Sequence, residues 1–113
     1  MQRNTLIQVT QNGMGTGSEE LGLQLITNYF KLLDADGRTP KIIVFYNGGV
    51  KLICKNSPAL EALQNLHKKG VQLLACKTCL SHFDLLDQIE VGTVGSMPDI
   101  ITLQANADKI INL

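Results

Sequence analysis

Apolar residues follow two alternating patterns along this chain, one typical of buried strands and the other of amphipathic helices. Short uninterrupted apolar runs that are rich in β-branched residues predict strands covered on both faces. Longer stretches in which apolar residues recur three and four positions apart predict helices. Strands are expected at residues 6–9, 42–46, 71–75, 91–94 and 109–113, and helices at 18–33, 57–69 and 78–86, with a last helix that begins at residue 96.

This alternation predicts an α/β fold with three layers, α/β/α, built on a parallel sheet of about five strands. No internal repeat or linker divides the 113 residues, so we expect one domain over residues 1–113. Three helix caps are expected from Thr16 (in a capping box with Glu19), Ser57 and Thr78. The inner face of the last helix is expected to carry Met97, Ile100 and Ile101.

Composition excludes several classes of partner. Ten basic and ten acidic residues give a formal net charge of zero, and only 4% of the residues are aromatic. Because nucleic-acid interfaces use basic patches and stacking aromatics, we expect no nucleic-acid partner and no membrane partner. The longest apolar runs are too short to span a bilayer, and the chain begins at its first strand without an apolar leader. Three cysteines in such a chain predict reduced thiols in the cytoplasm.

Three loops with distinctive residues follow expected strands, at residues 11–18, 47–56 and 76–79. The carboxyl ends of parallel strands meet at one edge of the sheet, where α/β proteins bind ligands. The first loop is rich in glycine, but Ser18 stands where a dinucleotide fingerprint requires Gly, and no Gly-Lys-Ser/Thr follows. We therefore expect no nucleotide cofactor there.

The third loop, Cys76-Lys77-Thr78-Cys79, points to cysteine sulfur chemistry. A thiol at the N-terminus of a helix faces partial positive charge, which favours the nucleophilic thiolate. Lys77 adds a positive charge, and His82 shares a helix face with Cys79, as in an imidazolium–thiolate pair. The spacing of the two cysteines also permits a disulfide, through which one thiol resolves a persulfide on the other.

Other interpretations of the cysteines remain open. Cysteine is often a small buried hydrophobe, and both members of the pair fit that role as well. Cys54 is either a core residue or a third thiol at the same edge of the sheet. Zinc would require Cys54, Cys76, Cys79 and His82 as ligands, but a second Cys-x-x-Cys pair is missing. We therefore expect no metal.

Four stretches, read together, carry a family resemblance. They are Gly13-Met14-Gly15-Thr16-Gly17-Ser18-Glu19-Glu20-Leu21-Gly22, Phe45-Tyr46-Asn47-Gly48-Gly49-Val50-Lys51-Leu52, the segment 70–80 with its cysteine pair, and Ala107-Asp108-Lys109-Ile110. On these stretches, which run in order across nearly the whole chain, the sequence resembles the DsrE/DsrF-like family. It looks most like the C-terminal domain of YedF-type proteins, which are sulfurtransferase-like and linked to selenium metabolism.

The resemblance implies self-association into homotrimers or larger rings. It also implies that Cys76 carries persulfide sulfur between partner proteins, with Cys79 as the supporting or resolving thiol. Two departures from the family pattern stand out. No Cys-Pro carrier domain precedes this one, so a separate sulfur donor or carrier protein is expected. Relay members tend to place Arg and Gly shortly after the reactive cysteine, where this chain has His82, Phe83 and Asp84.

Two functional hypotheses follow. In the first, the chain is a sulfurtransferase-like sulfur-relay protein in which Cys76 accepts sulfane sulfur and Cys79 resolves it. Lys77, Thr78 and His82 would support the thiolate. In the second, the chain is a non-catalytic oligomeric module whose thiols are structural or redox-sensing. Loading with persulfide sulfur separates the two, because a module would accept none.

Overall fold

Five strands form the sheet at the centre of the molecule, in the order β4-β3-β2-β1-β5. A computed structural model describes residues 3–113 of the chain. The strands are β1 (Arg3–Val9), β2 (Pro40–Phe45), β3 (Gln72–Cys76), β4 (Thr93–Gly95) and β5 (Lys109–Asn112). Every neighbouring pair is parallel, and Leu6 at the middle of β1 stands opposite Ile42 on one side and Ile110 on the other. The predicted parallel sheet of five strands is confirmed.

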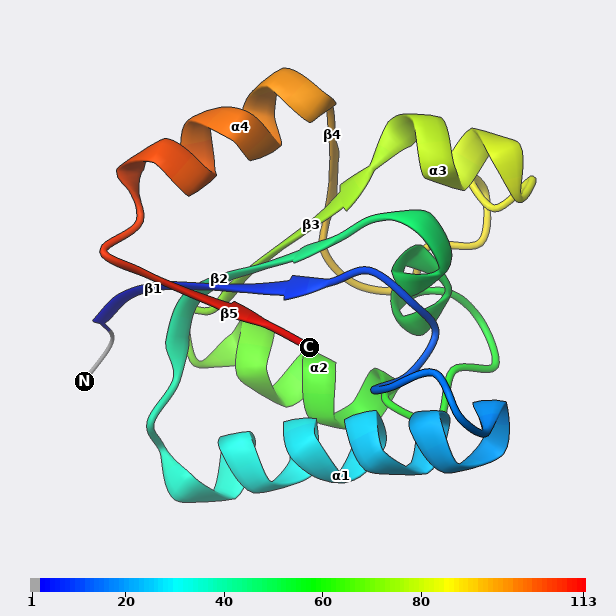
Figure 1. The fold of residues 1–113 in the computed structure, drawn as a ribbon, viewed down its shortest axis with the longest axis horizontal. Helices are drawn as coiled ribbons and strands as arrows, with labels where there is room; N and C mark the ends of the chain where they lie inside the picture. Colours follow the sequence, from blue (N-terminus) through cyan, green and yellow to red (C-terminus); the bar gives the residue numbers. More distant parts are fainter. Residues whose placement is uncertain (1–2) are drawn as a thin grey trace.

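Helices cover both faces of this sheet, as the alternation predicted. The helices α1 (Glu19–Asp36) and α2 (Leu60–Lys68) lie on one face, and α4 (Met97–Asn106) lies on the other (Figure 1). The short helix α3 (Lys77–His82) and the 3-10 helix η1 (Asn47–Ile53) follow β3 and β2 at the edge where the strands end. The three-layer α/β/α architecture is confirmed, and it gathers the segments after β1, β2 and β3 at one edge.

The two faces of the sheet bury different amounts of apolar surface. The α1 and α2 side holds the main core, which includes Phe30, Phe45 and Leu63, all fully buried. The α4 side holds a smaller cluster, made of Leu6, Ile42, Val44, Cys76 and Ile100. Most of the hydrophobic stabilisation therefore comes from the side that α1 and α2 cover.

Side-chain N-caps are present at α1 and α4 but not at α2 and α3, and none of the three caps expected from Thr16, Ser57 and Thr78 lies at its predicted place. The α1 cap is Ser18, whose Oγ accepts a hydrogen bond from the Leu21 N–H at 3.1 Å, so the predicted Thr16–Glu19 capping box is wrong. The α2 helix begins at Leu60, after a turn in which the Ser57 Oγ accepts from the Ala59 N–H at 3.1 Å. Because Ser and Thr cap turns as readily as helices, the sequence pattern does not separate these positions.

The last helix begins where the sequence predicted. Ser96 and Asp99 form a capping box, and Pro98 lies in the first turn. The predicted inner face is only partly right: Ile100 is fully buried, but Met97 is 44% exposed and Ile101 is 58% exposed. Ile100 and the half-buried Leu103, three residues apart, form the stripe that faces the sheet, and Ile101 is rotated away from it.

Two expectations concern membranes and leader segments. Within residues 3–113, no helix combines the length and the apolar character that crossing a bilayer requires. The expectation that no leader precedes the first strand rests on Met1 and Gln2, which lie outside the described residues.

Candidate functional site

The cysteine pair lies where β3 passes into α3. Cys76 is the last residue of β3 and, with an extended backbone (φ −70°, ψ 123°), stands at the N-cap of α3. Cys79 is the third residue of that helix. Because the helix begins at Lys77, Thr78 lies inside its first turn, and the predicted capping role of Thr78 is wrong.

The two thiols of the pair differ in their access to solvent. Cys76 is 2% exposed and belongs to the apolar cluster beneath α4. Cys79 is only partly buried and lines a cavity. Cys76, which the resemblance implies as the carrier of persulfide sulfur, is therefore closed to solvent. Side chains alternate between the two faces of a strand, and the last residue of β3 faces α4. Cys79 is the thiol of the pair that small molecules reach.

A backbone group from a distant segment contacts the Cys79 sulfur. The N–H of Asn47, the first residue of η1, donates a hydrogen bond to Cys79 Sγ at 3.0 Å. Asn47 has a left-handed backbone (φ 52°), which Asn adopts more readily than most residues. A Cβ atom on Gly49 would come within 2.2 Å of the Val9 carbonyl oxygen. Gly49 therefore permits the close approach of η1 to β1 that sets Asn47 beside the sulfur.

The pKa of the Cys79 thiol is raised above its ordinary value. Burial is the largest cause, because it penalises the charged thiolate. The Asn47 N–H lowers the pKa, whereas the interaction with Cys76 raises it further. The predicted lowering of the pKa by the helix terminus is wrong for Cys79. The lowering contribution comes from the Asn47 N–H, and burial of the sulfur outweighs it.

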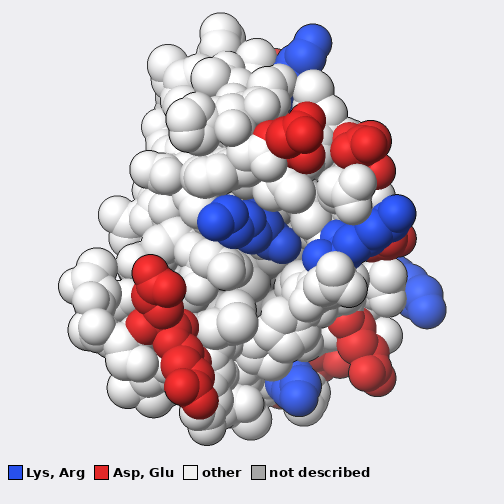
Figure 2. All heavy atoms as spheres, turned by 90° about the vertical axis from the view of Figure 1, so that its right-hand side faces the viewer, with Lys and Arg blue, Asp and Glu red and all other residues white. Residues whose placement is uncertain are grey.

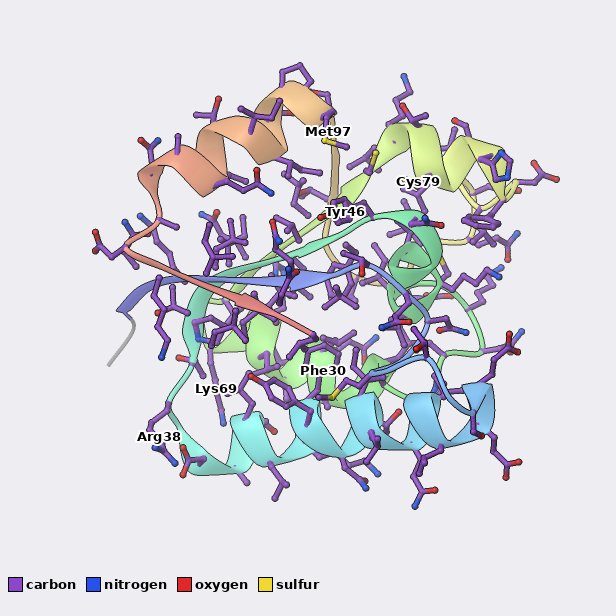
Figure 3. The ribbon with its side chains drawn as sticks, viewed as in Figure 1. Phe30, Arg38, Tyr46, Lys69, Cys79 and Met97 are labelled. Atoms are coloured by element: carbon purple, nitrogen blue, oxygen red, sulfur yellow. The ribbon has the colours of Figure 1, made fainter. Side chains whose placement is uncertain are left out.

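Cys79 opens into a cavity of about 500 Å³ between the ends of the sheet, α3 and α4. Its lining comes from four segments of the chain and consists of Thr10, Tyr46, Asn47, Thr78, Cys79, His82, Phe83 and Met97. Cys79, Tyr46 and Met97 lie at the same corner of the molecule (Figure 3). His82 thus shares the cavity with Cys79, in agreement with the helix face that the sequence predicted for the two residues.

Aromatic contacts fix the outer wall of this cavity. The rings of His82 and Phe83 meet edge to face, with centroids 5.0 Å apart. The Lys51 ammonium lies 4.6 Å from the centroid of the Phe83 ring, in a cation–π contact. Lys77 is exposed and is not part of the lining. Its predicted support of the thiolate stays a prediction.

Cys54 lies away from this corner, in the core beneath α2. It is 2% exposed, and its thiol donates a hydrogen bond to the Val50 carbonyl at 3.3 Å. Burial, with a smaller contribution from the charge of Glu90, raises the pKa of this thiol. The position agrees with the first of its two interpretations, a core residue. Among residues 3–113, no three His, Cys, Asp or Glu side chains come together as metal ligands.

With this geometry in place, comparison with known proteins gives the family. A family model described as the DsrE/DsrF-like family matches residues 4–113. The chain belongs to the DsrE/DsrF-like family. This family is associated with sulfur relay, and its members are often oligomeric. The closer likeness to YedF-type proteins stays a prediction.

Solved structures agree with the DsrE-like fold. The ychN protein from E. coli is 17% identical, with a TM-score of 0.71 and complete coverage (100%) of both chains. MTH1491 from Methanobacterium thermoautotrophicum, a protein of unknown function, is 19% identical, with a TM-score of 0.73 over 96% of this chain and 97% of that one. BT1422 from Bacteroides thetaiotaomicron, also of unknown function, is 17% identical, with a TM-score of 0.68 over 97% and 95%. Among curated protein sequences, none matches significantly.

Sequence reasoning missed five of the residues that line this cavity: Thr10, Tyr46, Asn47, Phe83 and Met97. Thr10 directly follows β1, and Tyr46 directly follows β2. Met97 is the first residue of α4, the helix that comes after β4. The rule that ligands bind beyond the carboxyl ends of strands was therefore a sufficient signal for these positions. The hydrogen bond from Asn47 to Cys79 could not be predicted from the residue types, because its donor is the backbone N–H of Asn47.

Proposed function

We propose that this chain is a sulfur-relay protein in which Cys79 accepts sulfane sulfur as a persulfide. The single observation that carries the proposal is the partly exposed Cys79 sulfur, which faces a cavity and accepts a hydrogen bond from Asn47. An N–H placed at a sulfur stabilises negative charge there, and both the thiolate and the terminal sulfur of a persulfide carry such charge. Membership of a family associated with sulfur relay supports the same function.

The proposed reaction moves one sulfur atom without net oxidation. The Cys79 thiolate attacks the terminal sulfur of a donor persulfide, R–S–SH. A bond forms between Sγ and that sulfur, the donor S–S bond breaks, and R–S⁻ leaves and takes up a proton. Discharge runs in the same sense: an acceptor thiolate attacks the outer sulfur, and Cys79 leaves as a thiolate. We propose that His82, in the same cavity, takes the Cys79 proton before attack.

In this proposal, the roles that the resemblance gave to the two cysteines are exchanged. Cys76 is buried behind Cys79, which favours Cys79 as the first acceptor and Cys76 as the resolving thiol. As the resolving thiol, Cys76 attacks Cys79 Sγ. That step forms a Cys76–Cys79 disulfide and releases hydrosulfide from the persulfide.

The proposed partners are a separate sulfur donor or carrier protein and further copies of this chain. Relay requires that the persulfide passes between proteins. Assembly into a homotrimer or larger ring is proposed from the family. Exposed large apolar residues on α1, namely Leu21, Leu25 and Leu32, are consistent with such an assembly.

A second candidate function is a non-catalytic module with structural or redox-sensing thiols. The raised pKa of Cys79 favours it, because less thiolate forms at neutral pH. Intact-mass analysis of reduced protein, incubated with a small persulfide, separates the two candidates. For the relay, the mass rises by one sulfur in the wild type, Cys76→Ser and Cys54→Ser, but not in Cys79→Ser. If no version gains sulfur, the relay proposal fails and the module is the better account.

A further inference from the structure

We infer that the donor for Cys79 presents its sulfane sulfur on an uncharged, partly apolar group, and that anionic donors are disfavoured. The inference rests on the proposed function, because it names the class of donor for that same thiol. It is carried by the chemistry of the cavity walls around Cys79.

The walls contain no permanently ionised side chain. Of the eight residues that line the cavity, all within the described part of the chain, none is Lys, Arg, Asp or Glu. Apolar surface comes from the Phe83 and Tyr46 rings and from the thioether of Met97. The polar groups are the hydroxyls of Thr10, Tyr46 and Thr78, the amide of Asn47 and the imidazole of His82.

The two lysines nearest in the sequence to lining residues do not supply the missing charge. Lys51 is engaged with the Phe83 ring and lines the neighbouring cavity beside the glycine-rich loop. Lys77, exposed on α3, is absent from the lining. Figure 2, which looks onto the edge where the strands end, shows a broad uncharged area at the upper left, with charged side chains to its right and below.

An anionic donor would meet repulsion from the Cys79 thiolate that, within the lining, only the proton taken up by His82 offsets. The attacking Cys79 sulfur is itself negative, and partial burial strengthens the repulsion between two like charges compared with bulk water. Protein sites that bind anions use Arg, Lys or the N-terminus of a longer helix to offset that cost. A donor whose carrying group is uncharged, called the neutral donor below, avoids this added repulsion, and its apolar part gains contact with Phe83, Tyr46 and Met97.

The donor class is tested with two persulfides that differ in one group. N-acetylcysteine persulfide carries a carboxylate, and the persulfide of N-acetylcysteine amide carries an amide in its place. Rates of sulfur uptake are followed by intact mass and divided by the rates for an unstructured cysteine peptide, which removes differences in intrinsic reactivity. We expect the neutral donor to load the protein about tenfold faster than the anionic one after this normalisation. Equal normalised rates, or a faster anionic donor, would overturn the inference.

Two matched variants on α4 place a new cation inside and outside the cavity. Met97→Lys adds a positive charge to the lining, whereas Ile101→Lys adds the same charge at a 58% exposed position that is not in the lining. We expect Met97→Lys to reduce the preference for the neutral donor by at least about threefold and Ile101→Lys to leave it unchanged. The same change in both variants would contradict a role for the cavity walls.

An alkylation experiment keeps this inference separable from the proposed function. Iodoacetamide is neutral and iodoacetate is anionic. Peptide mapping measures the rate at which each reagent alkylates Cys79, and each rate is divided by the rate for the same unstructured cysteine peptide. A normalised preference for iodoacetamide, together with faster uptake from the neutral persulfide, supports the inference. Sulfur uptake without any charge preference overturns the inference and leaves the proposed function standing. Charge-selective alkylation without sulfur uptake from either donor overturns the proposed function, and with it the assignment of a donor class.

Discussion

The two faces of the sheet are built from the same strands but differ in the size of their apolar cores and in the thiols that they hold. On the α1 and α2 side, the apolar core is large, and its cysteine, Cys54, is buried within it. On the α4 side, the apolar cluster is small. Beside it, the Gln8 side chain hydrogen-bonds to Gln104 and to Asn112. The corner of that second face holds the cavity with Cys79. The difference indicates that stability resides mainly on one face and candidate chemistry on the other.

The largest expected effect tests the stabilising face. Phe30 is fully buried on α1, so Phe30→Ala should lower the free energy of unfolding by about 3–5 kcal/mol. Gln24→Ala, at an exposed position on the same helix, is the matched control and should change it by less than about 0.5 kcal/mol. Urea denaturation measures both. Similar losses in the two variants would contradict the division between the faces.

A smaller effect is expected at the junction of the two regions. Gly49→Ala drives a Cβ into the Val9 carbonyl, so η1 must shift, at a cost of about 1–3 kcal/mol. The shift moves the Asn47 N–H from the Cys79 sulfur, and sulfur uptake should slow. Gly17→Ala is the control, since nothing lies within 4 Å of its added Cβ. Unchanged stability and uptake in Gly49→Ala would show that the close approach is not required.

Cysteine variants on the two faces of the sheet are expected to change the free energy of unfolding by about 1 kcal/mol or less. Cys54→Ala removes a buried sulfur and its hydrogen bond to Val50, so it should cost about 1 kcal/mol and leave sulfur uptake intact. Cys79→Ala should cost less than about 0.5 kcal/mol and abolish uptake. Denaturation curves and intact mass on the same samples check both. The reverse pattern, with uptake lost in Cys54→Ala alone, would contradict the assignment of chemistry to the α4 side.

The smallest effect is expected from alkaline pH. The pKa values of Cys54 and Cys79 are both raised in the folded state, mainly by burial, so folding favours their neutral thiols. Their contribution to stability is therefore fully present below the ordinary thiol pKa of about 8.5 and is lost as the pH rises through the folded pKa.

We expect the free energy of unfolding to fall between about pH 8 and about pH 10 and to fall less in Cys54→Ala. Urea denaturation at the two pH values checks this. Cys79 and, at the upper end of this range, Tyr29, whose pKa values burial also raises, should leave a residual fall in that variant. A free energy that rises with pH, or an identical fall in the variant, would contradict the expectation.

The sequence was sufficient for the fold because periodicity and connectivity act over short distances. The apolar runs 42–46 and 71–75 located β2 and β3 within one or two residues, and Ser96 located the start of α4. Alternation of strands and helices then left a parallel three-layer arrangement as the expected solution. The residues that precede and cap α1 and α2 did not follow from the sequence, because several Ser and Thr residues near the start of each helix offer equivalent caps.

The candidate site was predictable in its place but not in its details. The carboxyl edge of the sheet and the Cys76–Cys79 pair followed from motif and topology. Which thiol is exposed did not follow, because a continuously apolar strand such as β3 has no period of two that would mark its faces. The hydrogen bond from Asn47 to Cys79 joins residues 32 positions apart, and only the packing of η1 against the end of β1 creates it.

The most direct test of the central claim is the location of added sulfur in the wild-type chain. Reduced protein is loaded with the neutral persulfide, the persulfide is trapped by alkylation, and peptide fragmentation assigns the extra sulfur to Cys54, Cys76 or Cys79. The account predicts that the first sulfur appears on Cys79, before any Cys76–Cys79 disulfide forms. First appearance on the buried Cys76 would contradict the claim that solvent access decides which thiol accepts sulfur.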